Sequence, residues 1–230
     1  MIPQYDWPVN LLALDTSTEA CSVALMRADG QVFSRFQVAP RKHNELLPQM
    51  MDQVIEEAAI SRTDLTHCAF ANGPGAFTGI RIAAAQAQGV GMGLNIPLVR
   101  ISTLAVLAQA GLDSMDKDTV LVALDARMNE IYWAVYRRDD KGIARLRGLE
   151  RLDSIESVGT DDHIDCGVGH GWLESLRQTV DYPVDAELLP SALALLPLAH
   201  DAIASGHVVP AEQAEINYLR MQVAEKPAAR

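Results

Sequence analysis

The stretch from His67 to Gly93 constrains this chain more than any other. It reads HCAFANGPGAFTGIRIAAAQAQGVGMG, a short apolar segment followed by a glycine-proline turn and a long run of small residues. We expect a strand ending at Ala71 and a turn over 72–75, because glycine takes backbone angles that other residues avoid and proline fixes its own. A helix then begins at Phe77 or Thr78.

The small residues of this helix form a regular row. Gly79, Ala83, Ala87 and Gly91 recur every four residues, so they share one face. Glycine in a helix interior costs up to about 1 kcal/mol relative to alanine, so these glycines need a reason. Close packing is one reason, either inside the same domain or against a helix of another chain. Approach of a ligand to the backbone of the preceding turn, Gly73–Gly75, is the other.

Length and charge limit the classes of function. The 230 residues are enough for one large domain or two of ordinary size. The formal net charge of −11 disfavours a broad basic face that grips nucleic acid alone. If RNA is involved, we expect a partner to supply the positive charge.

The cysteines and the apolar runs indicate a compartment. Cys21, Cys68 and Cys166 are scattered and form no CxxC pair, which favours a reducing cytoplasm over a disulfide-bonded secreted fold. The first residues lack the basic and apolar regions of a signal peptide, and no apolar run approaches the roughly 20 residues that span a bilayer. We therefore expect a cytoplasmic protein without a membrane partner.

The chain opens with an antiparallel meander. Residues 10–25 contain two apolar strands, and the first of them ends at Asp15. Asp29-Gly30 is a hairpin signal before a third strand over 31–38.

A helix follows over 44–59, with Asn44 as its expected cap. Two neighbouring rows make its apolar stripe broad and rich in methionine, which fits the default of covering its own sheet but also leaves room for a partner. The rows are Leu46, Met50, Val54 and Ala58, and Leu47, Met51, Ile55 and Ala59.

The start of the chain then repeats. Residues 11–25, LLALDTSTEACSVAL, resemble residues 121–135, LVALDARMNEIYWAV, without a gap, and Asp15 is matched by Asp125. The polar break over 111–118 lies before the repeat. We therefore expect an α/β protein with an N-terminal lobe over 1–110 and a smaller C-terminal lobe over 111–230, facing one cleft. The second lobe is predicted to hold a strand over 163–168, a glycine turn over 167–171, and helices over 172–180 and 193–205.

The roles of Asp15 and Asp125 have two interpretations. Acids at strand ends beside glycine turns suit phosphate chemistry through a metal and backbone N–H groups. Alternatively, each carboxylate caps its own turn. The two readings weigh equally for Asp15, and the capping reading is favoured for Asp125.

Several familiar active-site motifs are missing from the sequence. There is no GxxxxGK[ST], no GxGxxG after a strand, no HExxH and no GxSxG. No two histidines are four residues apart, so no helical metal pair is expected.

Three segments together resemble the bacterial TsaB (YeaZ) family: ALDTSTEACSVAL at 13–25, NGPGAFTGIRIA at 72–83 and YLR at 218–220. The resemblance implies the duplicated fold of the actin/Hsp70/sugar-kinase (ASKHA) superfamily. It also implies a non-catalytic partner of TsaD in forming N6-threonylcarbamoyladenosine (t6A) at position 37 of tRNAs that read ANN codons. TsaD carries a His-x-x-x-His metal pair on the helix after the first meander, whereas His43 here is followed by Leu47, so no metal is expected. Ala76 and Ala83 depart from the residues usual in the family, and residues 1–8 extend beyond its usual start.

The resemblance also implies an interface. The first two helices of the family pair with TsaD, or with a second copy when the protein is alone, and TsaE joins the larger complex. No cofactor is assigned to this chain, ATP or ADP is expected only in the complex, and tRNA is reached only through it. The predicted interface residues are Leu46, Leu47, Met50, Met51, Val54, Gly79, Ala83, Ala87 and Gly91. The rival is an independent ATPase or phosphotransferase that uses Asp15 and Asp125, with Gly73 and Gly75 as a nucleotide loop.

Overall fold

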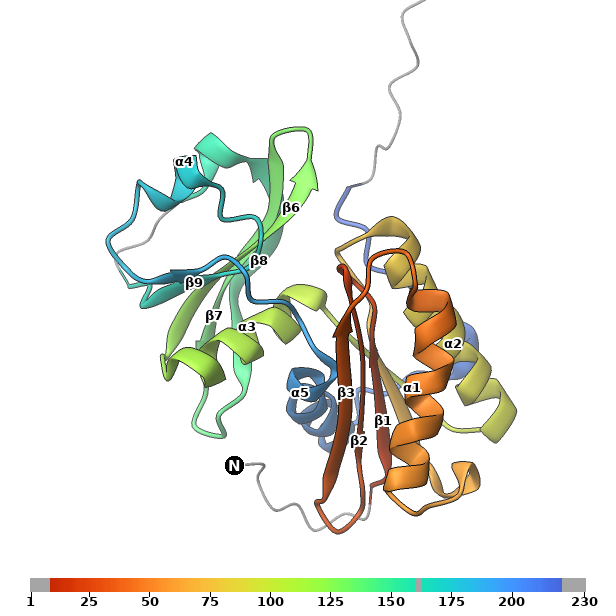
Figure 1. Ribbon diagram of the computed structural model, residues 1–230. Coiled ribbons are helices and arrows are strands. Elements are labelled where there is room, and N and C mark those ends of the chain that lie inside the picture. Colours follow the sequence, from red (N-terminus) through yellow and green to blue (C-terminus); the bar gives the residue numbers. More distant parts are fainter. Residues whose placement is uncertain (1–8, 160–162, 221–230) are drawn as a thin grey trace, which may run out of the picture.

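The computed structural model describes residues 9–159 and 163–220, and the expected N-terminal extension and the end of the C-terminal tail lie outside these ranges. Two five-stranded mixed sheets form two lobes (Figure 1). This confirms the predicted α/β fold class of the actin/Hsp70/sugar-kinase type.

The first sheet has the strand order β3-β2-β1-β4-β5. Its first three strands form the predicted antiparallel meander, and β4 and β5 run parallel to β1. Asp29-Gly30 makes the expected turn, with Gly30 at a φ of 84°. The strands are β1 Leu11–Asp15, β2 Ala20–Met26, β3 Val32–Val38, β4 His67–Ala71 and β5 Leu98–Ile101.

The second sheet repeats this plan in the order β8-β7-β6-β9-β10. Its first three strands are again antiparallel, and its last two again run parallel to the central strand. The predicted internal duplication is therefore confirmed at the level of topology. The strands are β6 Thr119–Arg127, β7 Glu130–Arg138, β8 Ala144–Ser154, β9 Cys166–Val168 and β10 Val184–Asp185.

The gap-free repeat holds for the first strand of each lobe but not for the second. Ala13 pairs with Ala24, whereas the equivalent Ala123 pairs with Trp133 rather than Ala134. A register shift between Asp125 and Arg127 shortens the second hairpin by one residue.

In the described part of the chain, five α-helices flank the sheets: α1 His43–Glu57, α2 Phe77–Leu94, α3 Thr103–Met115, α4 Glu174–Arg177 and α5 Ala192–Ala204. α1 and α2 lie side by side on one face of the first sheet, and α3 and α5 lie between the two sheets (Figure 1). The largest core cluster joins both lobes across α3 and α5. A smaller cluster covers the outer face of the second sheet.

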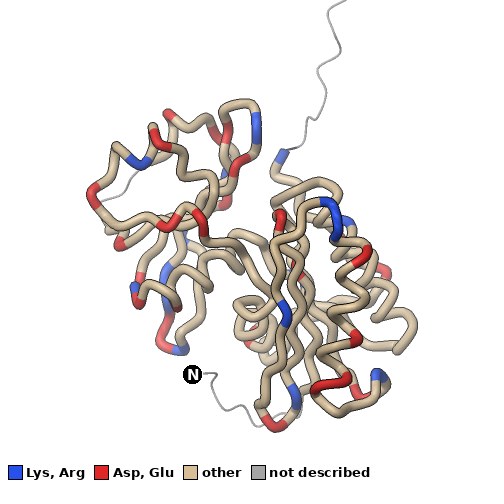
Figure 2. The backbone as a smooth tube through the Cα atoms, in the orientation of Figure 1, with Lys and Arg blue, Asp and Glu red and all other residues tan. Residues whose placement is uncertain are grey.

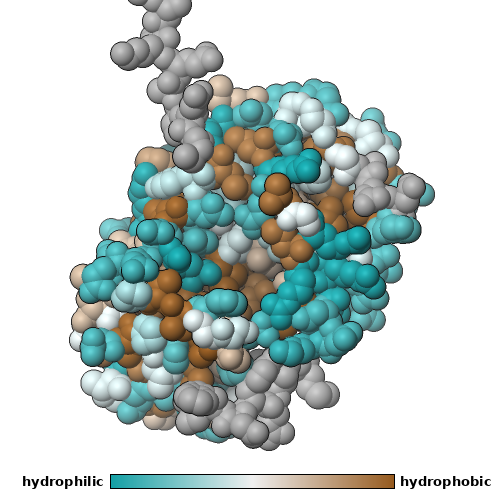
Figure 3. All heavy atoms as spheres, turned by 180° about the vertical axis from the view of Figure 1, so that it is seen from behind, coloured by the Kyte–Doolittle hydropathy of each residue, from teal (hydrophilic) through white to brown (hydrophobic). Residues whose placement is uncertain are grey.

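The surface carries the acidic excess of the composition. Asp and Glu number 30 against 19 Lys and Arg, and acidic positions occur on both lobes (Figure 2). The face seen from behind mixes hydrophilic and hydrophobic side chains (Figure 3). Among the helices of residues 9–159 and 163–220, none is long and apolar enough to cross a bilayer.

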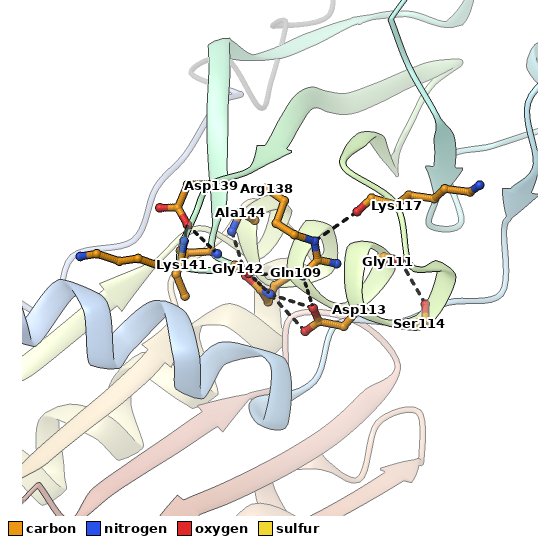
Figure 4. Close-up of polar contacts among 11 residues, drawn as sticks. Gln109, Gly111, Asp113, Ser114, Lys117, Arg138, Asp139, Lys141, Gly142 and Ala144 are labelled. Carbon is orange, nitrogen blue, oxygen red and sulfur yellow. Dashed lines mark hydrogen bonds and ion pairs between the residues drawn. The ribbon is translucent and has the colours of Figure 1, made fainter. Parts of the chain in front are cut away.

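The expected break after residue 110 is not where α3 ends. α3 continues through Gly111 to Met115, and Gly111 packs against Val168 of the second sheet. Gln109 fixes the helix to the β7–β8 turn, because its amide donates to the Gly142 carbonyl at 3.0 Å and its oxygen accepts from the Ala144 N–H at 2.9 Å (Figure 4). Burial of Gly111 and Leu112 between the lobes extends the helix into the segment that was expected to be a polar break.

The C-terminal part also returns to the first lobe. α5 contacts β1, β2, β4 and β5, and Val209 forms a bridge with Leu98. A division at 110/111 therefore separates segments that pack together: residues 192–217 lie largely against the first sheet.

Two smaller expectations also need correction. Asn44 does not cap α1; the helix begins one residue earlier, after Lys42, and no side chain caps it. The helix expected over 172–180 is only the short α4, because Trp172 is buried against Gly167 instead of opening a helix.

Candidate functional site

A large open cleft of about 1780 Å³ lies between the lobes. The β1–β2 turn, the start of α1, the Pro74–Gly79 segment, the β6–β7 turn and residues 217–220 line it. The strand ends of both repeats thus face one cleft, as the duplication predicts.

Asp15 lies behind this cleft and is not among the residues that line it. Its side chain is 1% exposed, and Oδ1 accepts hydrogen bonds from the Ser17 N–H at 2.8 Å and the Ser17 hydroxyl at 2.6 Å. Oδ2 is buried and has no hydrogen-bond partner among the residues that the structure describes, and burial raises the pKa of Asp15 to about 6. The carboxylate therefore caps its own turn, as one of the two interpretations predicts, and burial of the second oxygen carries a desolvation cost.

Asp125 does line the cleft, but its carboxylate is also used locally. Oδ1 accepts from the Arg127 N–H at 2.7 Å, and Oδ2 pairs with the Arg127 guanidinium at 2.9 Å. Arg127, Met128 and Asn129 all have positive φ, so the turn is tight, and the Asp125 N–H donates to His170 at 3.0 Å. The favoured capping reading of Asp125 matches this geometry.

The glycines of the Gly73–Gly75 turn are explained by the chain's own backbone. A Cβ on Gly73, which has a φ of 105°, would lie 2.8 Å from the Asn217 carbonyl oxygen. A Cβ on Gly75 would collide with the Ser17 carbonyl. Close approach is therefore needed here, but the approaching group belongs to the protein.

The predicted interface rows face inward. The buried leucine, methionine, valine and alanine side chains pack in one core cluster with the first sheet, and Leu46 is half-buried against the same cluster. Gly79 lies against the Thr16 backbone, and Gly91 lies against Leu98 and Ala211. Close packing inside the domain therefore explains these small and apolar residues, and none of them offers a wide surface to another chain. The buried residues are Leu47, Met50, Met51, Val54, Gly79, Ala83, Ala87 and Gly91.

A different row of α2 faces outward. Phe77, Ala85, Gly89, Met92 and Gly93 are exposed, and a Cβ on either glycine would meet nothing within 4 Å. α2 has 18 residues and only one charged side chain, Arg81. On α1 the exposed side is acidic, with Glu45, Asp52, Glu56 and Glu57. We call these outward residues of the two helices the α1–α2 face.

The C-terminal segment closes one side of the cleft. Asn217 donates its N–H to the Asn72 carbonyl at 2.8 Å and its amide to Glu150 at 3.2 Å, so it links the two lobes. Arg220 donates to the Ala126 carbonyl at 3.0 Å and pairs with Glu130. The sequence indicated YLR only as a family motif, because nothing local announces partners so distant along the chain.

The described residues contain no group of three or more His, Cys, Asp or Glu side chains that could hold a metal ion. His43 is buried at the start of α1 beside the cleft. The histidines are otherwise spread over both lobes.

Comparison with known proteins shows which proteins this chain is similar to. A family model described as TsaD, tRNA N6-adenosine threonylcarbamoyltransferase, matches residues 37–162. The tRNA threonylcarbamoyladenosine biosynthesis protein TsaB of Escherichia coli K12 is 38% identical, over 95% of this chain and 97% of that protein. The chain belongs to the TsaB family. The TsaB of Haemophilus influenzae is 34% identical over 95% and 96% of the two chains.

A solved structure agrees with the TsaB assignment. YeaZ from Pseudomonas aeruginosa has 42% identity and a TM-score of 0.86, and the match covers 92% of this chain and all of that one. A second structure from the same organism, described as similar to peptidase YEAZ, has a TM-score of 0.88. The chain is therefore a TsaB-family protein of tRNA threonylcarbamoyladenosine biosynthesis.

Proposed function

We propose that this TsaB-family chain is a non-catalytic subunit that docks TsaD for t6A formation at position 37 of tRNAs reading ANN codons. The docking surface in this proposal is the α1–α2 face. In the absence of TsaD, the same face joins two copies of the chain. TsaE joins the larger complex, where ATP or ADP is also bound.

One observation carries the proposal: α2 is almost uncharged although it covers the outside of the first lobe. Phe77 and Met92 are 58% and 57% exposed at its two ends, and Ala85 and Gly89 between them leave the helix backbone accessible. A second helix can approach such a row closely. Exposed contiguous apolar surface on a folded protein typically marks an interface.

The acidic side of α1 makes one side of the proposed interface negatively charged. Asp52 pairs with Arg62, and Glu57 pairs with Arg35, but Glu45 and Glu56 take part in no ion pair within the described residues. We expect the TsaD surface opposite α1 to be basic, since complementary charges orient partners.

The rival function is an independent ATPase or phosphotransferase that uses Asp15 and Asp125. The local use of both carboxylates by their own turns weighs against it. Nucleotide turnover by the isolated chain tests it directly. Turnover that is lost in Asp125→Asn would favour the enzyme.

The scaffold is tested by light scattering coupled to size exclusion, on the chain alone and mixed with TsaD. We expect a dimer that converts to a one-to-one complex. Gly89→Leu adds bulk where the fold leaves open space, so it should abolish both assemblies without unfolding the protein. Ala204→Leu, at the exposed end of α5, is the matched control. Normal assembly of Gly89→Leu would remove α2 from the interface.

A further inference from the structure

The outer face of the second sheet carries a cluster of arginines that the overall charge conceals. In the register of β7 and β8, Trp133 lies opposite Arg151, and Arg137 lies opposite Arg145. Val135, which lies between Trp133 and Arg137 on the same face of β7, is opposite Arg147. Directly opposed residues of antiparallel strands project to the same side. The sequence places these arginines in a chain of net charge −11, so composition gave no sign of the cluster.

Only one of these arginines is neutralised. Arg145 pairs with Asp139 at 2.8 Å and with Asp201 at 2.7 Å. Within residues 9–159 and 163–220, no ion pair involves Arg137, Arg147 or Arg151, and all three are exposed. We call these three residues, with Trp133, the arginine face.

The two nearest acids in these strands both accept hydrogen bonds, Asp153 within the arginine face and Glu150 outside it. Asp153 accepts a hydrogen bond from the Trp133 ring N–H at 2.9 Å. Glu150 belongs to the other side of β8, where it accepts from the Tyr136 hydroxyl at 2.6 Å and from Asn217.

Three members of the arginine face, but not Arg137, line a shallow hollow of about 270 Å³. Arg147, Leu149, Arg151 and Gly159 line it together with Trp133. The guanidinium carbon of Arg151 lies 5.5 Å from the centroid of the Trp133 ring, which fixes one arginine by a cation–π contact. Leu149 is 70% exposed beside them. Guanidinium groups bind phosphate in a bidentate manner, and arginine and apolar surfaces accept unstacked bases.

The arginine face lies far from the α1–α2 face. The α1–α2 face covers one side of the first sheet, the shared core with α3 and α5 follows, and the arginine face is on the far side of the second sheet. Figure 1 shows α1 and α2 on the opposite side of the molecule from the second lobe. A partner on the α1–α2 face therefore leaves the arginine face open.

We propose that the arginine face binds the phosphate backbone of RNA. The inference rests on the proposed function, because the RNA is the tRNA that the complex modifies. Charge complementarity selects this occupant: the cluster gathers three unpaired arginines on one face of a molecule whose net charge of −11 otherwise repels a polyanion. This chain then contributes directly to tRNA affinity in the complex, in addition to what TsaD supplies.

The test compares two double variants in the complex with TsaD. Arg137→Ala/Arg147→Ala removes two unpaired charges of the arginine face. Arg100→Ala/Lys141→Ala removes two charges that are already paired, with Glu215 and Asp201, and changes the net charge equally. Binding of a tRNA transcript is measured by fluorescence anisotropy at several KCl concentrations, after co-elution with TsaD and a thermal melt are recorded for each variant.

We expect the arginine-face variant to bind tRNA about tenfold more weakly, and its salt slope to fall by roughly 0.7–0.9 for each lost phosphate contact. The paired-charge variant should match the parent protein, and Arg137→Lys/Arg147→Lys should retain the parent slope. Unchanged affinity and slope in the arginine-face variant, with TsaD still co-eluting, would overturn this inference and leave the proposed function intact. Equal weakening in both alanine variants would also overturn it, as a general effect of net charge. Failure of the unmodified chain to co-elute with TsaD would instead refute the proposed function.

Discussion

The hydroxyl of Thr16 donates a hydrogen bond to the carbonyl of Gly79 at 2.7 Å, and the two backbones lie in direct contact. This contact fixes the β1–β2 turn to the first turn of α2. A Cβ on Gly79 would overlap the Thr16 carbonyl oxygen. We therefore expect Gly79→Ala to destabilise the fold by about 1–3 kcal/mol, the usual cost of overpacking. Urea unfolding monitored by circular dichroism measures it.

Gly89→Ala is the matched control for Gly79→Ala. The same helix holds both glycines, but a Cβ on Gly89 meets open space. Here alanine should stabilise the isolated chain by about 0.5–1 kcal/mol, because only the helix propensity changes. If both variants move the unfolding midpoint in the same direction, backbone contact does not explain the glycine at 79.

A second prediction separates the buried row of α2 from its exposed row. Ala87 is fully buried, so Ala87→Leu must force the core apart and should cost about 1–3 kcal/mol. Any loss of TsaD binding in this variant would follow from damage to the fold. Thermal melts of Ala87→Leu and Gly89→Leu check the difference: we expect a clear drop in Tm for the first and little change for the second.

The sequence predicted an interface on the buried row of α2 because periodicity alone cannot tell which face of a helix is covered by its own sheet. Periodicity shows that Gly79, Ala83, Ala87 and Gly91 share a face, but not whether a sheet or a partner covers it. The exposed row, centred on Ala85 and Gly89, has the same spacing, so only the position of the first sheet distinguishes the two.

Other features of the fold also differ in whether residues close in the sequence or contacts between distant segments determine them. The meander, the Asp29-Gly30 turn and α1 are encoded by nearby residues and were predicted. The contacts of Asn217 with Asn72 and Glu150 join segments far apart in the chain, so no local pattern announces them. The continuation of α3 past Gly111 depends on burial between two sheets, which overrides the polar appearance of 111–118.

The buried carboxyl of Asp15 predicts a dependence of stability on pH. Burial raises its pKa from 3.8 to about 6, so the native state holds a proton that the unfolded state loses. The associated stability is present below about pH 4 and is lost as the pH rises to about 6. At roughly 1.4 kcal/mol per pKa unit, the loss reaches about 3 kcal/mol at most.

Asp15→Asn should remove that dependence, because an amide keeps an oxygen for Ser17 but carries no charge. The free energy of unfolding of the variant, relative to the parent, should therefore increase between pH 4 and pH 6 in urea titrations. Asp125→Asn is the control, since its carboxylate is partly exposed and pairs with Arg127. A parent–variant difference for Asp15→Asn that stays constant across this range would rule out a buried titrating carboxyl.

The last prediction concerns Arg220, which holds the β6–β7 turn from the C-terminal segment. Its guanidinium donates to the Ala126 carbonyl, pairs with Glu130 and contacts the Met128 sulfur at 3.7 Å. The turn contains three consecutive residues at positive φ, a conformation that costs about 1–2 kcal/mol per residue and therefore needs outside support. Arg220→Ala should leave the global unfolding midpoint nearly unchanged, because the cores do not depend on this side chain. It should speed hydrogen exchange at 126–130 severalfold, as a local opening does. Arg220→Lys should restore only part of the protection, since a single ammonium cannot reproduce the planar fork that reaches both Ala126 and Glu130. Unchanged exchange at 126–130 in Arg220→Ala would mean that Asp125 and the hairpin alone hold the turn.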